Sequence, residues 1–205
     1  MFSEKGLGES AAKGEPSRTM DHLIKDSATI ELYAWLDPDA EIPGWDVLTG
    51  NPFGTSLPED QFTTVQNYFA EYHLEYYRQR LYNRFPSRLH ALLLFATKVD
   101  AENFRAKHPS RVYGKYLVRA RSKGPYTVSF HDSSWLDYLR LPHSLSLSTL
   151  DEVSNYYWKG MLVEEIGLTF LDEPWREPPV IEALFQGSLE PVSLQPQTRW
   201  LPGFS

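Results

Sequence analysis

The sequence predicts an α+β fold, because short β-rich segments alternate with a few helical segments that lack the regular spacing of βαβ units. Hydrophobic residues make up 41% of the 205 residues, which is enough apolar material for one core. A chain of this length buries roughly 70% of the surface that its unfolded form exposes. We therefore expect a single domain over residues 29–205.

The composition excludes several classes of function. Without cysteine, the chain holds no disulfide, no cysteine-ligated zinc, no iron–sulfur cluster and no thiol nucleophile. The net charge of -7 argues against a protein that holds DNA mainly through its phosphates. No run approaches the ~20 apolar residues of a membrane-spanning helix, and residues 1–18 lack the apolar centre of a signal peptide. We expect no membrane partner, and a protein that is cytoplasmic or delivered into a target cell without a cleavable signal.

The first part of the chain is predicted to be a flexible tail or junction over residues 1–28. Gly, Ser, Lys and Glu dominate it, and few large apolar side chains are present to offset the entropy of ordering. Residues 29–36 are β-rich and alternate loosely, which predicts the first strand. Residues 42–57 are rich in Gly and Pro and are expected to form a long, functional loop.

The strongest helix is predicted to begin near Pro58 and to continue to about Arg84. Its large apolar residues recur at spacings of three and four, which predicts one buried stripe made of Phe62, Val65, Phe69, Tyr72 and Tyr76. The other face carries Glu71, Glu75, Arg78 and Gln79. Pro86 ends the helical segment.

The remaining elements are predicted from the same two periodicities. Strands are expected at residues 89–96, 112–121 and 180–185, and helices at residues 100–107 and 148–160. Residues 126–130 are expected to form a neighbouring strand or an extended segment, and residues 189–194 to continue extended after 180–185. Ser148 and Asp151 have the spacing of a capping box, and Gly160 ends that helix. Gln186-Gly187 is expected to form a turn or bulge.

Three short motifs carry side chains with chemical potential. In Pro86-Ser87-Arg88-Leu89 a helix gives way to a buried strand, and Ser87 and Arg88 could bind a phosphate or carboxylate or could serve only the turn. Tyr156-Tyr157-Trp158 cannot place all three rings in a core, because consecutive helical residues point in different directions. Glu182 interrupts an apolar strand, so it either faces water at an edge or faces a cleft that uses its charge.

Other patterns are weaker. The sequence contains no P-loop, Rossmann, zincin or serine-hydrolase motif. His131-Asp132 would point to opposite faces of a strand, so we expect no metal site. The basic residues at positions 78–88 favour a solvated face over a nucleic-acid groove. The 12 Tyr, 11 Phe and 6 Trp exceed what one core needs, and some are expected to surround a ligand.

The order of these motifs resembles that of the ADP-ribosyltransferase fold, in particular that of an uncharacterised bacterial ADP-ribosyltransferase-like family. A Tyr-containing strand and a Pro-Gly loop stand in TIELYAWLDPDAEIPGWDVL, followed by a Pro-Ser-Arg-Leu strand in PSRLHALLLF, a short helix in VDAENFRAKH and a strand in VYGKYLVRA. Tyr157-Trp158-Lys159-Gly160 and Glu182-Ala183-Leu184-Phe185 complete the correspondence over residues 29–194. The resemblance implies a split β-sandwich with flanking helices.

The resemblance also implies an NAD-dependent mono-ADP-ribosyltransferase, a bacterial or phage toxin or effector domain that cleaves the nicotinamide–ribose bond. Glu182 is then the catalytic carboxylate, which holds the ribose and stabilises its developing positive charge. The residues implied to bind NAD are Tyr33, Ser87, Arg88, Tyr157 and Trp158. This assignment requires Glu182 and Arg88 to lie on the same side of the sheet.

The partner implied by the resemblance is a macromolecular acceptor of ADP-ribose, a protein or alternatively a nucleic acid. A cognate inhibitor or immunity protein is a further expected partner. Attack by water instead of an acceptor would make the same site an NAD glycohydrolase. The remaining alternative is a catalytically dead binding module of the same fold, an inhibitor or adaptor, which the lack of an Arg or His beside Tyr33 favours.

Overall fold

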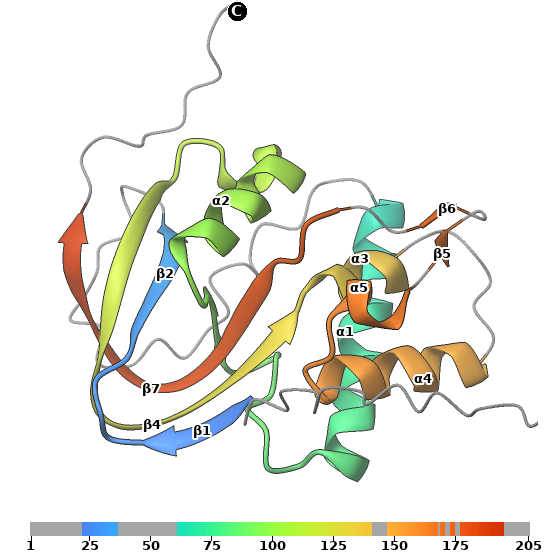
Figure 1. Ribbon diagram of the computed structural model, residues 1–205, viewed down its shortest axis with the longest axis horizontal. Helices are drawn as coiled ribbons and strands as arrows, with labels where there is room; N and C mark the ends of the chain where they lie inside the picture. Colours follow the sequence, from blue (N-terminus) through green and yellow to red (C-terminus); the bar gives the residue numbers. More distant parts are fainter. Residues whose placement is uncertain are drawn as a thin grey trace, which may run out of the picture.

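The computed structural model describes residues 22–36, 61–140, 147–167, 169–170, 173–174 and 177–194. The fold is mixed α and β, as predicted, with a strongly curved sheet and helices gathered mainly at one side of it (Figure 1). None of the helices in the described ranges is long and apolar enough to cross a membrane. The predicted loop at residues 42–57 lies outside the described residues.

The elements follow one another in a mixed order. The strands are β1 (Leu23–Asp26), β2 (Glu31–Leu36), β3 (Leu92–Phe95), β4 (Tyr116–Asp132), β5 (Thr169–Phe170), β6 (Glu173–Pro174) and β7 (Ile181–Leu194). The helices are α1 (Gln61–Leu81), α2 (Lys98–Lys107), α3 (Ser134–Leu139), α4 (Leu147–Trp158) and α5 (Val163–Ile166), with the 3-10 helix η2 (Pro109–Val112) after α2.

The antiparallel pairings of the main sheet close on themselves. β4 pairs with β2, β2 with β3, β3 with β7, and β7 again with β4, while β1 adds an edge beside β4. This closure depends on two long strands, β4 and β7, that bend and change partners along their length. The sequence predicted a strand at residues 112–121 with a neighbouring strand or extended segment at 126–130, and a strand at 180–185 with an extended continuation at 189–194. In the structure β4 spans most of the first two segments and β7 most of the last two.

A glycine marks one of the bends. Gly187 lies at the register shift between β4 and β7 and has a φ of 152°, a conformation that L side chains rarely adopt. A Cβ atom at this position would lie 2.8 Å from the Cβ of Tyr126, closer than packed atoms approach. The bulge expected at Gln186-Gly187 is therefore a point where only glycine fits.

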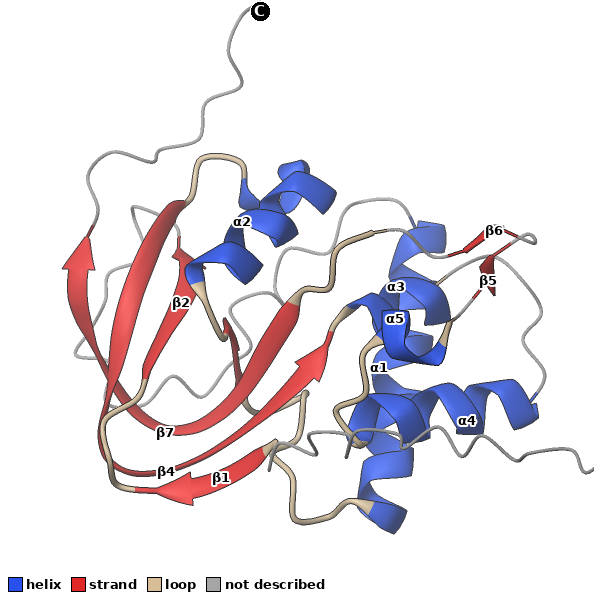
Figure 2. Ribbon diagram, viewed as in Figure 1, coloured by secondary structure: helices blue, strands red, loops and turns tan. Residues whose placement is uncertain are grey.

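The two faces of the sheet pack against different partners. The inner face is filled by apolar side chains from alternate strand positions, among them Leu32, Ala34, Leu92, Leu94, Val128, Ala183 and Phe185. The outer face packs Leu93 and Leu184 against α1, α3, α4 and α5, and packs Trp35 and Phe95 beneath α2. Figure 2 shows the first group of helices together at one end of the curved strands, apart from α2.

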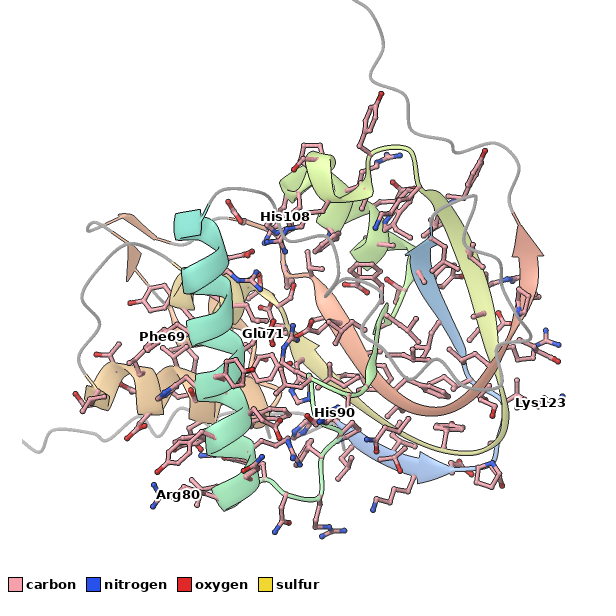
Figure 3. All side chains as sticks on the ribbon, turned by 180° about the vertical axis from the view of Figure 1, so that it is seen from behind. Phe69, Glu71, Arg80, His90, His108 and Lys123 are labelled. Atoms are coloured by element: carbon pink, nitrogen blue, oxygen red, sulfur yellow. The ribbon has the colours of Figure 1, made fainter. Side chains whose placement is uncertain are left out.

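The orientation of α1 corrects the predicted stripe. Phe69, Tyr72 and Tyr76 are 50%, 61% and 56% exposed, whereas Leu74 is fully buried and Glu75 is 6% exposed. Figure 3 shows Phe69 and Glu71 on opposite sides of the helix, with Glu71 toward the sheet. The side chains of Phe62 and Val65 lie outside the described part. The aromatic stripe is thus the solvent-exposed side of α1. The side of α1 that faces the sheet carries the carboxylates of Glu71 and Glu75, which accept hydrogen bonds from Arg88 and Ser87 of the following segment.

The start of the domain is also corrected. Residues 23–26, predicted to belong to the flexible tail, form β1 and pair with residues 126–129 of β4. The Nε2–H of His22 donates a hydrogen bond to the backbone oxygen of Trp158 at 2.9 Å, and the His22 ring stacks on Phe85. A strand of four residues with a charged end is too short to give a detectable alternation of apolar and polar residues. Its position depends on pairing with β4, which the sequence pattern does not show.

Two buried carboxylates fix where β7 begins. Asp100 completes a capping box with Thr97 at the start of α2, and its Oδ1 accepts a hydrogen bond from the backbone N–H of Ile181 at 2.8 Å. Asp132 accepts from the backbone N–H of Val180, the residue before β7, at 3.4 Å, and from the backbone N–H of Val163 at 3.1 Å. These bonds set the position of the residue that follows Ile181, which is Glu182.

Candidate functional site

A row of four side chains crosses the outer face of the sheet at the level of Glu182. Tyr33 of β2 is opposite Phe95 of β3, Phe95 is opposite Glu182 of β7, and Glu182 is opposite His131 of β4. Residues directly opposite one another point to the same side of a sheet. Glu182 therefore lies on the helix side, with an aromatic ring on one flank and an imidazole on the other.

Glu182 meets Arg88 and Tyr157 in the interior between the sheet and the helices. The Nη1 atom of Arg88 and the hydroxyl of Tyr157 both donate to Oε1 of Glu182, the latter at 2.7 Å. Arg88 Nη1 also donates to the Tyr157 hydroxyl at 2.9 Å. Glu182, Arg88 and Tyr157 are only 6%, 3% and 0% exposed. Glu182 and Arg88 thus lie on the same side of the sheet, and neither Arg88 nor Tyr157 bonds to the second oxygen, Oε2.

The guanidinium of Arg88 is fixed from its other edge by α1. Arg88 donates through Nε and Nη2 to the two carboxylate oxygens of Glu71, at 2.7 and 3.0 Å. This two-point contact leaves only Nη1 to face Glu182 and Tyr157. Arg88 is therefore shared between two carboxylates and cannot rotate toward one without leaving the other.

One turn further along α1, Glu75 holds the neighbouring residue. The hydroxyl of Ser87 donates to Glu75 at 2.8 Å, and Arg78 donates to the same carboxylate at 2.9 and 2.7 Å. Arg78 also donates to the backbone oxygen of Phe85 at 3.0 Å, which ties down the segment that leads into Ser87. Ser87 therefore bonds to the α1 scaffold and not to Glu182, and its hydrogen bond positions Arg88.

Burial and charge act in opposite directions on the two carboxylates. Burial raises the pKa of Glu182, although Arg88 and the Tyr157 hydroxyl favour its ionised form. Burial also disfavours ionisation of Glu71, but Arg88, Arg140 and Arg111 outweigh it and lower its pKa. Burial raises the pKa of Tyr157 well above its ordinary value, so the phenol keeps its proton and remains a donor.

His131 of β4 packs against Tyr157 and fixes its position. Its ring stacks on the Tyr157 ring at a centroid distance of 4.5 Å, and its Nδ1 lies 2.8 Å from the Tyr157 backbone oxygen. A carbonyl only accepts, so Nδ1 carries the proton and Nε2 accepts from the Ser129 hydroxyl at 2.8 Å. Burial lowers the pKa of His131 to about 3, which keeps this imidazole neutral.

The other predicted NAD-binding residues occupy different environments. Trp158 is fully buried, donates from Nε1 to the backbone oxygen of Leu74 at 2.9 Å, and packs against Tyr82 and Phe85. Its ring is part of the core. Tyr33 is half-buried at the far end of the row, with Phe95 between it and Glu182. The structure thus brings Glu182, Arg88 and Tyr157 into direct contact and leaves Tyr33 one strand further away.

Glu71 was not predicted as a site residue, because the charged face of α1 was expected to lie apart from the core. Arg140, which follows α3 and lies 3.4 Å from Glu71, was not predicted either. The available signal was the repeat of Glu71 and Glu75 at helical spacing, beside a motif with adjacent Ser and Arg.

Within the ranges that the structure describes, no group of three or more His, Asp or Glu side chains is arranged to hold a metal ion. Comparison of the chain with protein-family models and with curated proteins finds no match. The resemblance to ADP-ribosyltransferases therefore stays a prediction, and any function must be argued from the site.

Proposed function

We propose that the protein is an NAD-dependent mono-ADP-ribosyltransferase with an ADP-ribosyltransferase-like split β-sandwich, in which Glu182 is the catalytic carboxylate. The observation that carries the proposal is the contact of Glu182 with Arg88 and Tyr157 on one side of the sheet. A site residue predicted from a late strand and one predicted from the Pro-Ser-Arg-Leu motif, 94 positions apart, are direct partners.

The arrangement suits departure of a neutral leaving group from a sugar. The C1′–N bond of NAD breaks, its electron pair leaves with nicotinamide, and positive charge develops on the ribose ring. The ionised Glu182 carboxylate stabilises that charge more strongly than it stabilises the neutral sugar, which lowers the barrier. The oxygen left for the ribose 2′-hydroxyl is Oε2, since Arg88 and Tyr157 both donate to Oε1.

The acceptor completes the reaction. Its nucleophile forms a bond to C1′ and loses its proton to solvent, which gives the ADP-ribosylated product. The acceptor proposed is a protein, with nucleic acid as the other outcome of a labelling experiment, and a cognate inhibitor or immunity protein as a second partner. If water attacks instead, the same residues make an NAD glycohydrolase.

The test measures nicotinamide release and transfer of labelled ADP-ribose into a lysate, with the wild-type chain beside Glu182→Gln. Loss of the charge is expected to slow nicotinamide release roughly 100- to 1,000-fold, the usual effect of removing one group that stabilises transition-state charge. Glu190→Gln is the matched control, because Glu190 is an exposed glutamate of the same strand. Equal release by wild type and Glu182→Gln would contradict the proposal.

A second candidate, the catalytically dead binding module, is favoured by the neutralisation of Glu182 by Arg88 within the interior. On that alternative the ion pair only orders the fold. Neither the wild type nor any variant would then consume NAD, while Glu182→Gln would still alter thermal stability. The two measurements together distinguish the candidates.

A further inference from the structure

The side of α1 that faces away from the sheet carries the exposed aromatic stripe. Phe69, Tyr72 and Tyr76 are 50%, 61% and 56% exposed. They recur at spacings of three and four, so they lie on one face of the helix. Figure 3 shows Phe69 and Arg80 on the side of α1 away from Glu71. Large aromatic side chains gathered on one exposed face are typical of an interaction surface.

An exposed carboxylate of α4 flanks this stripe. Asp151 lies four residues after Leu147, which is 76% exposed, so the two share one face of α4. The Oδ1 atom of Asp151 lies 3.8 Å from Nε2 of His73 on α1, while the Asp151 side chain is 61% exposed. The His73 ring stacks on the Phe69 ring at a centroid distance of 6.0 Å. Negative charge therefore lies beside the stripe at the level of His73.

The other end of the stripe is basic. Arg80 lies one turn after Tyr76, and its Nη1 donates to the Tyr76 hydroxyl at 2.8 Å. Its guanidinium carbon lies 5.3 Å from the centre of the Tyr76 ring. Arg80 is held along the stripe in this way and is itself exposed. At 1.5 Å per residue, Arg80 lies about 10 Å along the helix from His73. The stripe thus has one charge of each sign, at different levels of the helix.

We propose that the aromatic stripe is the interface of a homodimer, in which α1 of one copy packs antiparallel against α1 of a second copy. A two-fold axis makes each contact twice, so such a surface must be complementary to itself. With the axis at the level of Tyr76, Arg80 lies about 6 Å along the helix from the axis. It is then opposite Tyr72 and His73 of the second copy, the level that Asp151 of that copy flanks. Arg80 and Asp151 therefore pair between the copies in both directions.

A second copy fits this surface better than a partner of one charge. An acidic partner would be repelled by Asp151 and a basic partner by Arg80, whereas the two-fold arrangement brings opposite charges together at both ends. The aromatic rings between the charges supply the buried centre that interfaces have inside a polar rim. Glu71 lies on the opposite side of α1 from Phe69 (Figure 3), so the dimer leaves the contacts of Arg88 and Glu182 in place. The inference is therefore independent of the proposed function.

The first experiment measures the mass of the full chain by sedimentation over a range of protein concentrations. The wild type is expected to be a dimer, and Tyr76→Glu, which places two carboxylates at the axis, is expected to be a monomer. Tyr76 is 56% exposed, so the substitution leaves the core intact, and circular dichroism and thermal unfolding verify the fold. Val99→Glu is the matched control, because Val99 is 67% exposed on α2, which lies apart from α1 (Figure 2).

A charge exchange tests the pairing itself. Arg80→Glu and Asp151→Arg are each expected to weaken the dimer about 10-fold or more, because each places like charges opposite one another. The double variant restores opposite charges and is expected to return the dissociation constant to near that of the wild type. Weakening by both single changes, with recovery in the double variant, supports the interface.

Three results would overturn the proposal. The first is a wild-type chain that stays monomeric up to about 100 μM. The second is a Tyr76→Glu chain that remains dimeric, which would place the interface elsewhere. The third is a double variant that associates as weakly as the single variants, because Arg80 and Asp151 would then not be partners.

Discussion

The two faces of one sheet differ in what they bury. Along β7, Ala183 and Phe185 point to an inner face whose described cluster is apolar. Glu182, the residue before them, points to the outer face and meets Arg88. Removing a charge from water costs several kcal/mol per ion, and well-packed apolar residues often serve stability as well or better. Both faces bury apolar clusters that stabilise the fold, so the charges buried on the outer face need an explanation in binding or chemistry.

The largest effect that would test this contrast is removal of the shared cation. Arg88→Met leaves the carboxylates of Glu71 and Glu182 without their main partner, which is expected to cost about 3–5 kcal/mol of stability. Both carboxylates would then prefer to be protonated in the folded state. Their folded pKa values would exceed the unfolded ones, so the loss of stability should be smaller at about pH 4 than at about pH 7. Urea unfolding at the two pH values measures this.

Leu94→Ala on the inner face is the matched comparison. Leu94 is 2% exposed, so truncation is expected to cost about 2–5 kcal/mol through lost burial and a cavity. No charge is uncovered there, and the loss should be the same at both pH values. If the two variants showed the same pH dependence, the outer face would not be electrostatically distinct.

The next effect concerns His131. Because its folded pKa is about 3 and the unfolded value is about 6.5, the unfolded chain binds a proton that the folded chain does not. Stability should therefore fall as pH drops below about 6.5, by about 1.4 kcal/mol per pH unit, or about 2 kcal/mol by about pH 5. Thermal unfolding over this range measures the slope.

Substitution identifies the group responsible for that slope. His131→Gln offers an amide donor and a carbonyl acceptor but does not titrate, so the pH dependence between about 6.5 and 5 should largely disappear. His90→Gln alters an exposed histidine and should retain it. If the stability of His131→Gln still fell with pH over this range, the pH dependence would belong to another titrating group.

A smaller effect is expected from Tyr157→Phe. The change removes one hydrogen bond to the Glu182 carboxylate and one from Arg88, and should cost about 1.5 kcal/mol. The Tyr157 hydroxyl favours ionised Glu182, so its loss should raise the pKa of Glu182 further. In the pH profile of the NAD-consumption rate, the fall in rate on the acidic side should then move to higher pH. An unchanged pH profile in Tyr157→Phe, together with lower stability, would show that Tyr157 has a purely structural role.

These contrasts also show how far sequence predicts this molecule. Glu182 could be found because a charge breaks the apolar pattern of a strand, and Arg88 because it follows a helix end. Glu71 could not, because helical periodicity identifies two faces of α1 without saying which one meets the sheet. That choice depends on the donors of Ser87 and Arg88, which only the folded chain brings beside α1. The continuity of β4 and β7 was likewise hidden by their bends.

The smallest expected effect tests which side of α1 faces the sheet. Phe69 is 50% exposed and its ring lies 6.0 Å from that of His73, so Phe69→Gln should change the free energy of unfolding by no more than about 0.5 kcal/mol. Leu74 lies on the buried side of the same helix, so Leu74→Ala should lower the free energy of unfolding by about 2–5 kcal/mol. Urea unfolding of both variants compares the two sides directly. A large loss in Phe69→Gln with a small one in Leu74→Ala would restore the aromatic stripe to the core, and would remove Glu71 from its place beside Arg88.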